Sequence, residues 1–262
     1  DAVITDSVAI GAELQMGAAD PPVVAIRNGI DTRWFDPVRE HVPSSVTQFT
    51  KDAQFVFGMV GRIHPVKGHL NFLKAARIVL DRYPNTRFVI VGTVLPGFEA
   101  YQQTLVKWIA EHDMTRSVLM THVSLVEIPS VFASLDVLVA PSFAESFSFT
   151  MLEGMAMGKT VVASNVGGAS EMIADGESGF LVPPDDVPAL TQALCFLIAD
   201  PDKTKLVGER ARAKIKQELS LDVMAERTWR VYERLVEVCR TSNKSSAAQA
   251  QLKKRLEEIG CK

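Results

Sequence analysis

Two glutamates, Glu145 and Glu153, are eight residues apart in a segment that runs from an apolar stretch into an apolar helical pattern. That spacing is a little over two helical turns, so two helical residues so placed lie roughly on one face. Glu145 stands among small and aromatic residues, whereas Glu153 falls between Leu152 and Met155. Carboxylates at two depths of one strand–loop–helix unit can accept hydrogen bonds from two separate groups of hydroxyls. A sugar joined to a ribose through phosphates is a ligand of that kind.

Each glutamate also has a simpler interpretation. Glu145 can be an acid on the surface, and Glu153 can merely cap or decorate its helix. However, a carboxylate without a partner in a buried segment costs free energy, and a ligand hydroxyl would supply that partner. The backbone N–H groups where the helix begins, near Phe149, are free to bind a phosphate oxygen. These features favour a ligand site over surface decoration.

Two cations, Arg62 and Lys67, follow another apolar stretch and precede an amphipathic one. Gly61, directly before them, allows the backbone to come close to a ligand. Cations five residues apart at this position can hold a diphosphate from two sides, and the helix N-terminus adds backbone donors. A solvated basic loop is the alternative. The position of the cations at the end of a predicted strand favours the binding interpretation.

Other motifs are less informative. Gly154–Thr160 resembles a phosphate-binding loop, but it has three residues between its glycines instead of four, and it precedes a strand. No Gly-x-Gly-x-x-Gly follows a strand, which disfavours a dinucleotide oxidoreductase. Gly167 and Gly168 follow a strand and open a helix, and we favour helix capping over ligand contact for Glu171.

The histidines show neither a catalytic triad nor a metal-ligand spacing. We interpret His64, His69 and His122 as loop residues, with His122 near the predicted ligand. Asp136, which precedes an apolar stretch, is interpreted as structural.

Short apolar runs alternate with amphipathic runs between Phe55 and Val182, which predicts a doubly wound parallel sheet covered on both faces. The predicted strands are Phe55–Val60, Arg87–Val91, Val118–Met120, Val137–Val139, Thr160–Ala163 and Phe180–Val182. The predicted helices are His69–Asp81, Glu99–Glu111, Ile128–Ser134 and Phe149–Met157. Ligands of such sheets bind beyond the carboxyl ends of the strands, where Arg62, Lys67 and Glu145 fall.

The ends of the chain have different patterns. The first twenty residues or so contain one predicted strand, Ala2–Thr5, and a helical pattern. After Pro183 the pattern is helical to Cys239. Residues 241–251 have the composition of a linker, and Leu252–Ile259 reads as a charged helical stub.

The composition is that of an ordinary soluble protein, with 262 residues, 47% hydrophobic content and a net charge of −3. The absence of a dense basic run before the C-terminal tail disfavours nucleic acid as a partner. Three scattered cysteines indicate free thiols in a reducing cytoplasm. No apolar run reaches the length of a membrane span, and the opening residues, beginning at Asp1, do not form a signal peptide. We therefore expect a cytoplasmic protein and a chain that is part of a longer one.

Five motifs in the correct order resemble the retaining group 1 glycosyltransferases of the GT-B fold, over roughly Val23 to Val238. They are Asn28–Asp31 with Phe35–Pro37, Gly61–Arg62 with Lys67–Gly68, Pro141–Ser142 before the two glutamates, Gly167–Gly168 with Glu171, and Asp175–Gly176 with Gly179–Val182. In that family two Rossmann-like domains face each other, and the C-terminal one binds the nucleotide-sugar donor.

The resemblance assigns a role to each site residue. Arg62 and Lys67 would hold the diphosphate, with Gly61 beside them, and would stabilise the charged leaving group, so no metal or other cofactor is expected. Glu145 would contact hydroxyls of the transferred sugar, and Glu153 would accept hydrogen bonds from the ribose. The rest of the expected donor-binding set is Val123, beside the base, and Ser146, Phe147, Ser148 and Phe149, around the sugar and phosphates.

The chain departs from the family pattern in two ways. Ser148 stands where the family usually has glycine, so the backbone there would approach the donor less closely. Residues 1–22 resemble only the end of the N-terminal domain and its linker, which leaves 23–220 as the donor-binding domain and 221–240 as the helix that crosses back. With the missing domain counted as a partner, we expect weak nucleotide binding and no sugar transfer by this chain alone.

Several choices stay open. A non-catalytic domain that binds a nucleotide sugar, or a GT-B-like sugar-nucleotide epimerase, is the alternative to the transferase. The nucleotide, the sugar and the acceptor, whether glycan, lipid-linked sugar or small molecule, are not identified. Peripheral attachment of the full-length protein to the inner face of a membrane is a further expectation for its location.

Overall fold

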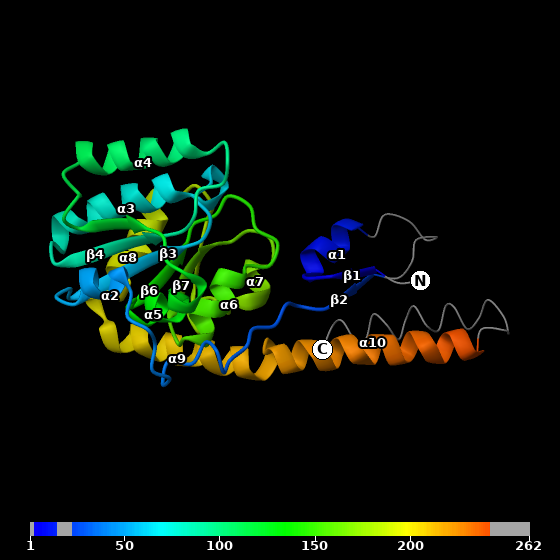
Figure 1. Cartoon of the computed structure of the whole chain (residues 1–262). Helices are drawn as coiled ribbons and strands as arrows, with labels where there is room; N and C mark the ends of the chain where they lie inside the picture. Colours follow the sequence, from blue (N-terminus) through cyan, green and yellow to red (C-terminus); the bar gives the residue numbers. More distant parts are fainter. Residues whose placement is uncertain (1–2, 15–22, 242–262) are drawn as a thin grey trace.

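A six-stranded parallel sheet is the centre of the computed structural model, which describes residues 3–14 and 23–241 (Figure 1). Its strands are β3 Phe55–Val60, β4 Thr86–Val91, β5 Val118–Thr121, β6 Val137–Ala140, β7 Thr160–Ser164 and β8 Phe180–Val182. Their order is β5-β4-β3-β6-β7-β8, and all neighbours are parallel. The chain direction across the sheet reverses between β3 and β6, so the predicted doubly wound α/β fold is confirmed.

Helices cover both faces of this sheet. They are α2 Ser45–Thr50, α3 His69–Arg82, α4 Glu99–Glu111, α5 Ile128–Ala133, α6 Phe149–Ala156, α7 Ala169–Met172, α8 Val187–Ala199 and α9 Pro201–Glu218. Alternate strand residues enter two separate cores: Val56 packs with α5, α6 and α9, whereas Phe57 packs with α3, α4 and α8. Because both sets are buried, the strands read as continuous apolar runs instead of alternating ones.

The helical region after Pro183 is divided more finely than its pattern predicts. It forms α8, α9 and α10 Leu221–Thr241, with a break at Asp200. The Asp200 side chain accepts a hydrogen bond from the Lys203 N–H at 3.0 Å, and Pro201 occupies the first turn of α9. A capping aspartate followed by proline starts a new helix, which is the local reason for the break.

The N-terminal residues form a small unit apart from the main sheet. Strands β1 Val3–Thr5 and β2 Val23–Ala25 pair in parallel, and α1 Val8–Leu14 follows β1 (Figure 1). The sequence-based division placed Val23 in the donor-binding domain, whereas β2 pairs with β1 outside the six-stranded sheet. We refer to β1, α1 and β2 together as the N-terminal unit.

Helix α10 leaves the main domain and runs beneath the N-terminal unit (Figure 1). Val24, Ile26 and Val231 form a small apolar cluster between this unit and α10. No helix among the described residues is long and apolar enough to cross a membrane. The predicted linker and charged helical stub lie outside the described residues, apart from Thr241, the last residue of α10.

Candidate functional site

A hollow of about 540 Å³ lies at the carboxyl ends of the central strands. Arg62 and Lys67, from the loop after β3, line it together with Glu145 and Ser146, from the loop after β6. The loop after β7 contributes Gly167, and Ile10 of α1 contributes an apolar side chain. The structure therefore brings together four of the side chains that the sequence assigned to a common site, at the point where open parallel sheets bind ligands.

Lys67 and Glu145 form an ion pair inside this hollow. The Lys67 Nζ donates to Glu145 Oε2 at 2.5 Å, and only 17% and 20% of the two side chains are exposed. The Ser142 hydroxyl donates to the same carboxylate oxygen at 3.4 Å. Arg62 is exposed and makes no hydrogen bond or ion pair that fixes it among the described residues. The hollow thus holds one shielded ion pair and one available cation.

Gly68 allows the loop that carries Lys67 to contact the loop that carries Glu145. Gly68 has φ +75°, and a Cβ there would stand 2.0 Å from the Pro141 carbonyl oxygen. The Phe143 N–H also donates to the Val66 carbonyl at 2.7 Å. Only glycine combines this left-handed conformation with so close an approach, so Gly68 sets the distance at which Lys67 meets Glu145.

Gly167 allows the loop after β7 to approach the segment that carries Glu145 closely as well. Its φ is +52°, and a Cβ there would stand 1.6 Å from the Glu145 carbonyl oxygen. The neighbouring Gly168 N–H donates to the Ser146 carbonyl at 2.7 Å. The loop after β7 therefore packs backbone against backbone on the segment that carries Glu145.

Replacing Gly167 with alanine should destabilise the protein more than the same change at Gly176. Both have positive φ, +52° and +73°, but nothing lies within 4 Å of a Cβ at Gly176. Alanine at either position should therefore cost about 1–2 kcal/mol of backbone strain, and only Gly167→Ala adds a clash with the Glu145 backbone. Urea unfolding of both variants measures the difference. Equal losses in the free energy of unfolding would show that the Gly167 loop does not pack this closely.

Glu153 lies on α6, outside the lining of the hollow. It is partly buried among fully buried helix neighbours and has no hydrogen-bond partner among the described residues. Burial disfavours its charged form and raises the pKa of the carboxyl to about 7. The prediction that this carboxylate lies in an apolar segment is thus correct, and its oxygens accept no hydrogen bond from the described residues.

The remaining predicted residues surround the start of α6. Phe147 and Ser148 are buried, whereas Phe149 is 54% exposed. The N–H groups of Phe149, Thr150 and Met151 have no acceptor among the described residues. Gly61, with φ +145°, faces this turn, because a Cβ there would lie 4.0 Å from the Thr150 hydroxyl. The first turn of α6 therefore presents free donors beside the hollow, as an anion site requires.

The positions of Val123 and His69 in the structure could not be read from local sequence patterns. Val123 is partly buried against the core and does not line the hollow. His69, interpreted as a loop residue although a helix was predicted to start there, is the fully buried first residue of α3 and packs edge-on against Tyr101 at 5.9 Å. Burial lowers the pKa of His69 to about 4, so its ring is neutral. Asp136 accepts the Val56 N–H at 2.7 Å, the structural role that was predicted.

A family comparison decides the class of protein. The model described as "Glycosyl transferases group 1" matches residues 45–214. The chain belongs to this family. The match includes every residue assigned to the site and stops short of the N-terminal unit and α10.

Relatives of this glycosyltransferase chain are similar to it over most of its length. A lipopolysaccharide core biosynthesis mannosyltransferase of Rhizobium leguminosarum bv. viciae is 30% identical over 90% of this chain and 65% of its own. A D-inositol 3-phosphate glycosyltransferase of Kribbella flavida is 29% identical over 89% of this chain and 54% of its own. The chain therefore spans less than two thirds of the length of these relatives.

Solved structures share the fold. A glycosyltransferase from Rickettsia africae superposes with a TM-score of 0.81 at 23% identity, over 90% of this chain and 64% of that one. Anabaena Alr3699/HepE in complex with UDP gives a TM-score of 0.77 at 24% identity, over 88% and 63%. The fold of this chain is thus the C-terminal part of a GT-B glycosyltransferase.

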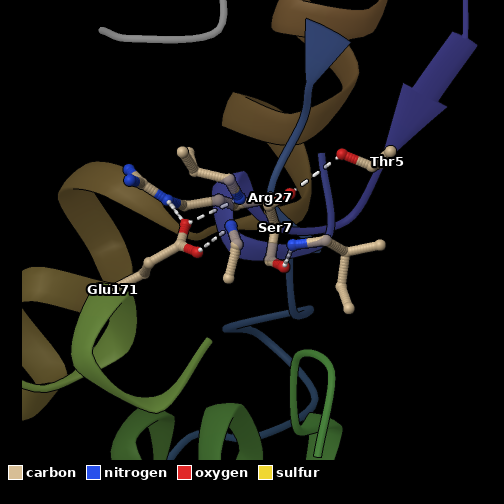
Figure 2. A network of polar contacts seen from close by, with 7 residues as sticks. Thr5, Ser7, Arg27 and Glu171 are labelled. Atoms are coloured by element: carbon tan, nitrogen blue, oxygen red, sulfur yellow. Dashed lines mark hydrogen bonds and ion pairs between the residues drawn. The ribbon is translucent and has the colours of Figure 1, made fainter. Parts of the chain in front are cut away.

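Glu171 has a role that the sequence of this glycosyltransferase chain indicated only in part. Helix capping was predicted, and its own helix α7 was the expected one. Instead, its carboxylate accepts the N–H groups of Val8 and Ala9, at 3.2 and 3.1 Å, at the start of α1 (Figure 2). The same carboxylate pairs with Arg27 Nε at 3.0 Å. Local position next to a helix start suggested capping, but it could not indicate a partner 163 residues away.

A larger hollow of about 640 Å³ lies at the other end of the sheet, near the start of β3 and of α9. Two of its cations already have partners: Arg212 pairs with Asp36 at 2.8 Å, and Lys159 donates to the Ala133 carbonyl at 3.1 Å. The hollow at the carboxyl ends of the strands is the candidate donor site, because open parallel sheets bind ligands at that edge. No cluster of three or more His, Cys, Asp or Glu side chains suited to a metal ion occurs in the described part of the chain.

Proposed function

We propose that this chain is the donor-binding half of a retaining glycosyltransferase and binds a nucleoside diphosphate sugar. The observation that carries the proposal is the hollow in which Arg62, Lys67 and Glu145 meet at the carboxyl ends of the central strands. Arg62 and Lys67 would bind the diphosphate, and Glu145 would accept sugar hydroxyls. Glu153 would accept the ribose hydroxyls, which would provide the partner that its carboxylate lacks.

The chemistry follows from these assignments. The bond between the anomeric carbon and the diphosphate oxygen would break, a bond from that carbon to the oxygen of an acceptor hydroxyl would form, and the departing diphosphate would take the proton of that hydroxyl. Negative charge grows on the departing diphosphate, so preorganised cations at Arg62 and Lys67 would stabilise the transition state more than the ground state. In this proposal that role needs no metal, because Arg62, Lys67 and the free N–H groups at the start of α6 would bind the anion.

The named complexes and relatives support the donor class and leave its identity open. Anabaena Alr3699/HepE was solved with UDP and with UDP-glucose, and relatives include mannosyltransferases and a glycogen synthase. Since this chain matches only part of such proteins, we propose that it binds nucleotide weakly and transfers no sugar without the remaining part.

Binding of nucleoside diphosphates tests the proposal. UDP, GDP and ADP are titrated into the purified chain, and then their sugars, with the melting temperature as readout. Arg62→Ala should weaken binding of the preferred diphosphate about tenfold, since it removes a charge-assisted contact. Its melting temperature without ligand should not change, because Arg62 is exposed.

Arg116→Ala is the matched control. Arg116 is also exposed, but it lies between α4 and β5 and does not line the hollow, so binding should stay unchanged. The proposal fails if no nucleoside diphosphate raises the melting temperature, or if both arginine variants bind equally well.

A further inference from the structure

The N-terminal unit contacts α7 and the loops of the candidate donor site through a network of polar contacts centred on Glu171 (Figure 2). The Glu171 side chain is only 13% exposed, and its two oxygens accept the Val8 and Ala9 N–H groups and the Arg27 Nε. Hydrogen bonds of this charge-assisted kind are stronger than neutral ones. One carboxylate on α7 therefore binds both the start of α1 and the segment that follows β2.

The start of α1 is built to receive this carboxylate. The Ser7 hydroxyl accepts the Ile10 N–H at 3.1 Å, and the Thr5 hydroxyl donates to the Ser7 carbonyl at 2.9 Å (Figure 2). Ser7 thus caps one of the free N–H groups of the first turn, and Glu171 takes the two before it. Helix starts leave such donors unsatisfied unless a side chain or ligand binds them. Without Glu171, the N–H groups of Val8 and Ala9 would lose their acceptor.

Glu171 is also connected to the donor site through the backbone. Its helix follows Gly168, whose N–H donates to the Ser146 carbonyl at 2.7 Å and whose Cβ position would lie 3.3 Å from the Ser7 Cβ. The Ser146 hydroxyl donates in turn to Asp6 at 3.3 Å. The turn before α7 is therefore in contact with the N-terminal unit on one side and with the segment carrying Glu145 on the other.

The position of α1 matters for the hollow because Ile10 lines it beside Arg62, Lys67 and Glu145. We propose that Glu171 is a positioning residue for the donor site, which holds α1 in place as a wall of the hollow without touching the donor itself. The inference rests on the proposed function, since the hollow is taken as the donor site. Docking of α1 and binding of the donor are then coupled, and the coupling is reciprocal.

Amide hydrogen exchange and diphosphate titration of the full chain test this inference together. In the wild type, the diphosphate selected by the thermal titration should slow exchange at Val8 and Ala9. Glu171→Ala should speed exchange there without ligand and weaken diphosphate binding about tenfold, a typical coupling factor. The conservative variant Glu171→Gln keeps one acceptor oxygen and should fall between the two.

Glu177→Ala is the matched control, because Glu177 is an exposed carboxylate in the loop after α7. It should behave as the wild type in both measurements. Arg27→Ala provides a variant outside the main domain: it removes one of the contacts to Glu171 and should weaken diphosphate binding in the same direction, by a smaller factor.

Failure of this inference can be told apart from failure of the proposed function. If the wild type binds a diphosphate and Glu171→Ala binds it equally well, Glu171 is not a positioning residue although the donor site stands. If the wild type binds no diphosphate at all, both proposals are wrong. Unchanged exchange at Val8 and Ala9 in Glu171→Ala would contradict the docking contact itself.

Discussion

Glu145→Gln should bind a nucleoside diphosphate about tenfold more tightly than the wild type, while it loses the additional affinity that an attached sugar provides. The reason is the ion pair in the hollow, where Glu145 holds the Lys67 ammonium at 2.5 Å. A diphosphate has to compete with this carboxylate for Lys67 and also meets its negative charge. For two charges a few ångströms apart near a protein surface, such repulsion is on the order of 1–3 kcal/mol.

Glu145 should weaken binding of the diphosphate alone but strengthen binding of the diphosphate sugar. Its hydroxyls would donate to Glu145, so the carboxylate that opposes the diphosphate would favour the complete donor. A neutral amide at this position frees Lys67 but offers a weaker acceptor. Lys67→Ala is the opposite case, because it leaves Glu145 without its cation and should weaken binding of both ligands.

Calorimetric titration of the two variants with the diphosphate and with its sugar measures these differences. Glu209→Gln is the control, since Glu209 is exposed on α9 near the other end of the sheet. If Glu145→Gln binds the diphosphate no better than the wild type, the ion pair does not compete with the ligand and Glu145 has a different role.

The sheet and its ligand edge could be predicted because they depend on local patterns. Strands such as Phe55–Val60 are covered on both faces, so an uninterrupted apolar run identifies them. The ligand side then follows from the direction of parallel strands, which placed Arg62, Lys67 and Glu145 at one edge. The start of α9 was also readable in principle, from Asp200 followed by Pro201, although the helical periodicity concealed it.

Contacts between distant segments could not be predicted in the same way. The Lys67–Glu145 distance depends on the left-handed turn at Gly68 and on how closely Pro141 passes it, neither of which a periodicity reveals. His69 shows the same limit: the helical pattern placed the start of α3 there but did not reveal that its side chain is buried in the core. Sequence identified the residues that could take part in chemistry, and packing decided which of them meet.

Glu153→Gln should stabilise the chain at alkaline pH and weaken nucleotide binding. The pKa of Glu153 is raised from 4.5 to about 7 in the folded state, because burial penalises the charge. Below pH 4.5 the carboxyl is protonated in both states and contributes nothing. Between pH 4.5 and 7 the unfolded state releases its proton first, so the free energy of unfolding falls as pH rises. Above pH 7 the loss is complete, on the order of 3 kcal/mol.

A glutamine does not titrate and avoids this loss, although burial of its amide offsets part of the gain. We therefore expect Glu153→Gln to raise the free energy of unfolding by about 1–2 kcal/mol at pH 8 and to change it little at pH 5. Calorimetric unfolding at the two pH values checks the prediction. Glu209→Gln, whose site is exposed, should show no such pH dependence.

The same substitution should lower nucleotide affinity tenfold or more, because a charge-assisted hydrogen bond from the ribose would be replaced by a weaker one. Stability and binding then change in opposite directions at one residue. A substitution that changed stability equally at both pH values would contradict the burial of a charged carboxylate. If instead affinity were retained, Glu153 would not meet the ribose. Both results as expected would explain an unpaired carboxylate in an apolar helix: the ligand supplies hydrogen bonds that the folded chain does not.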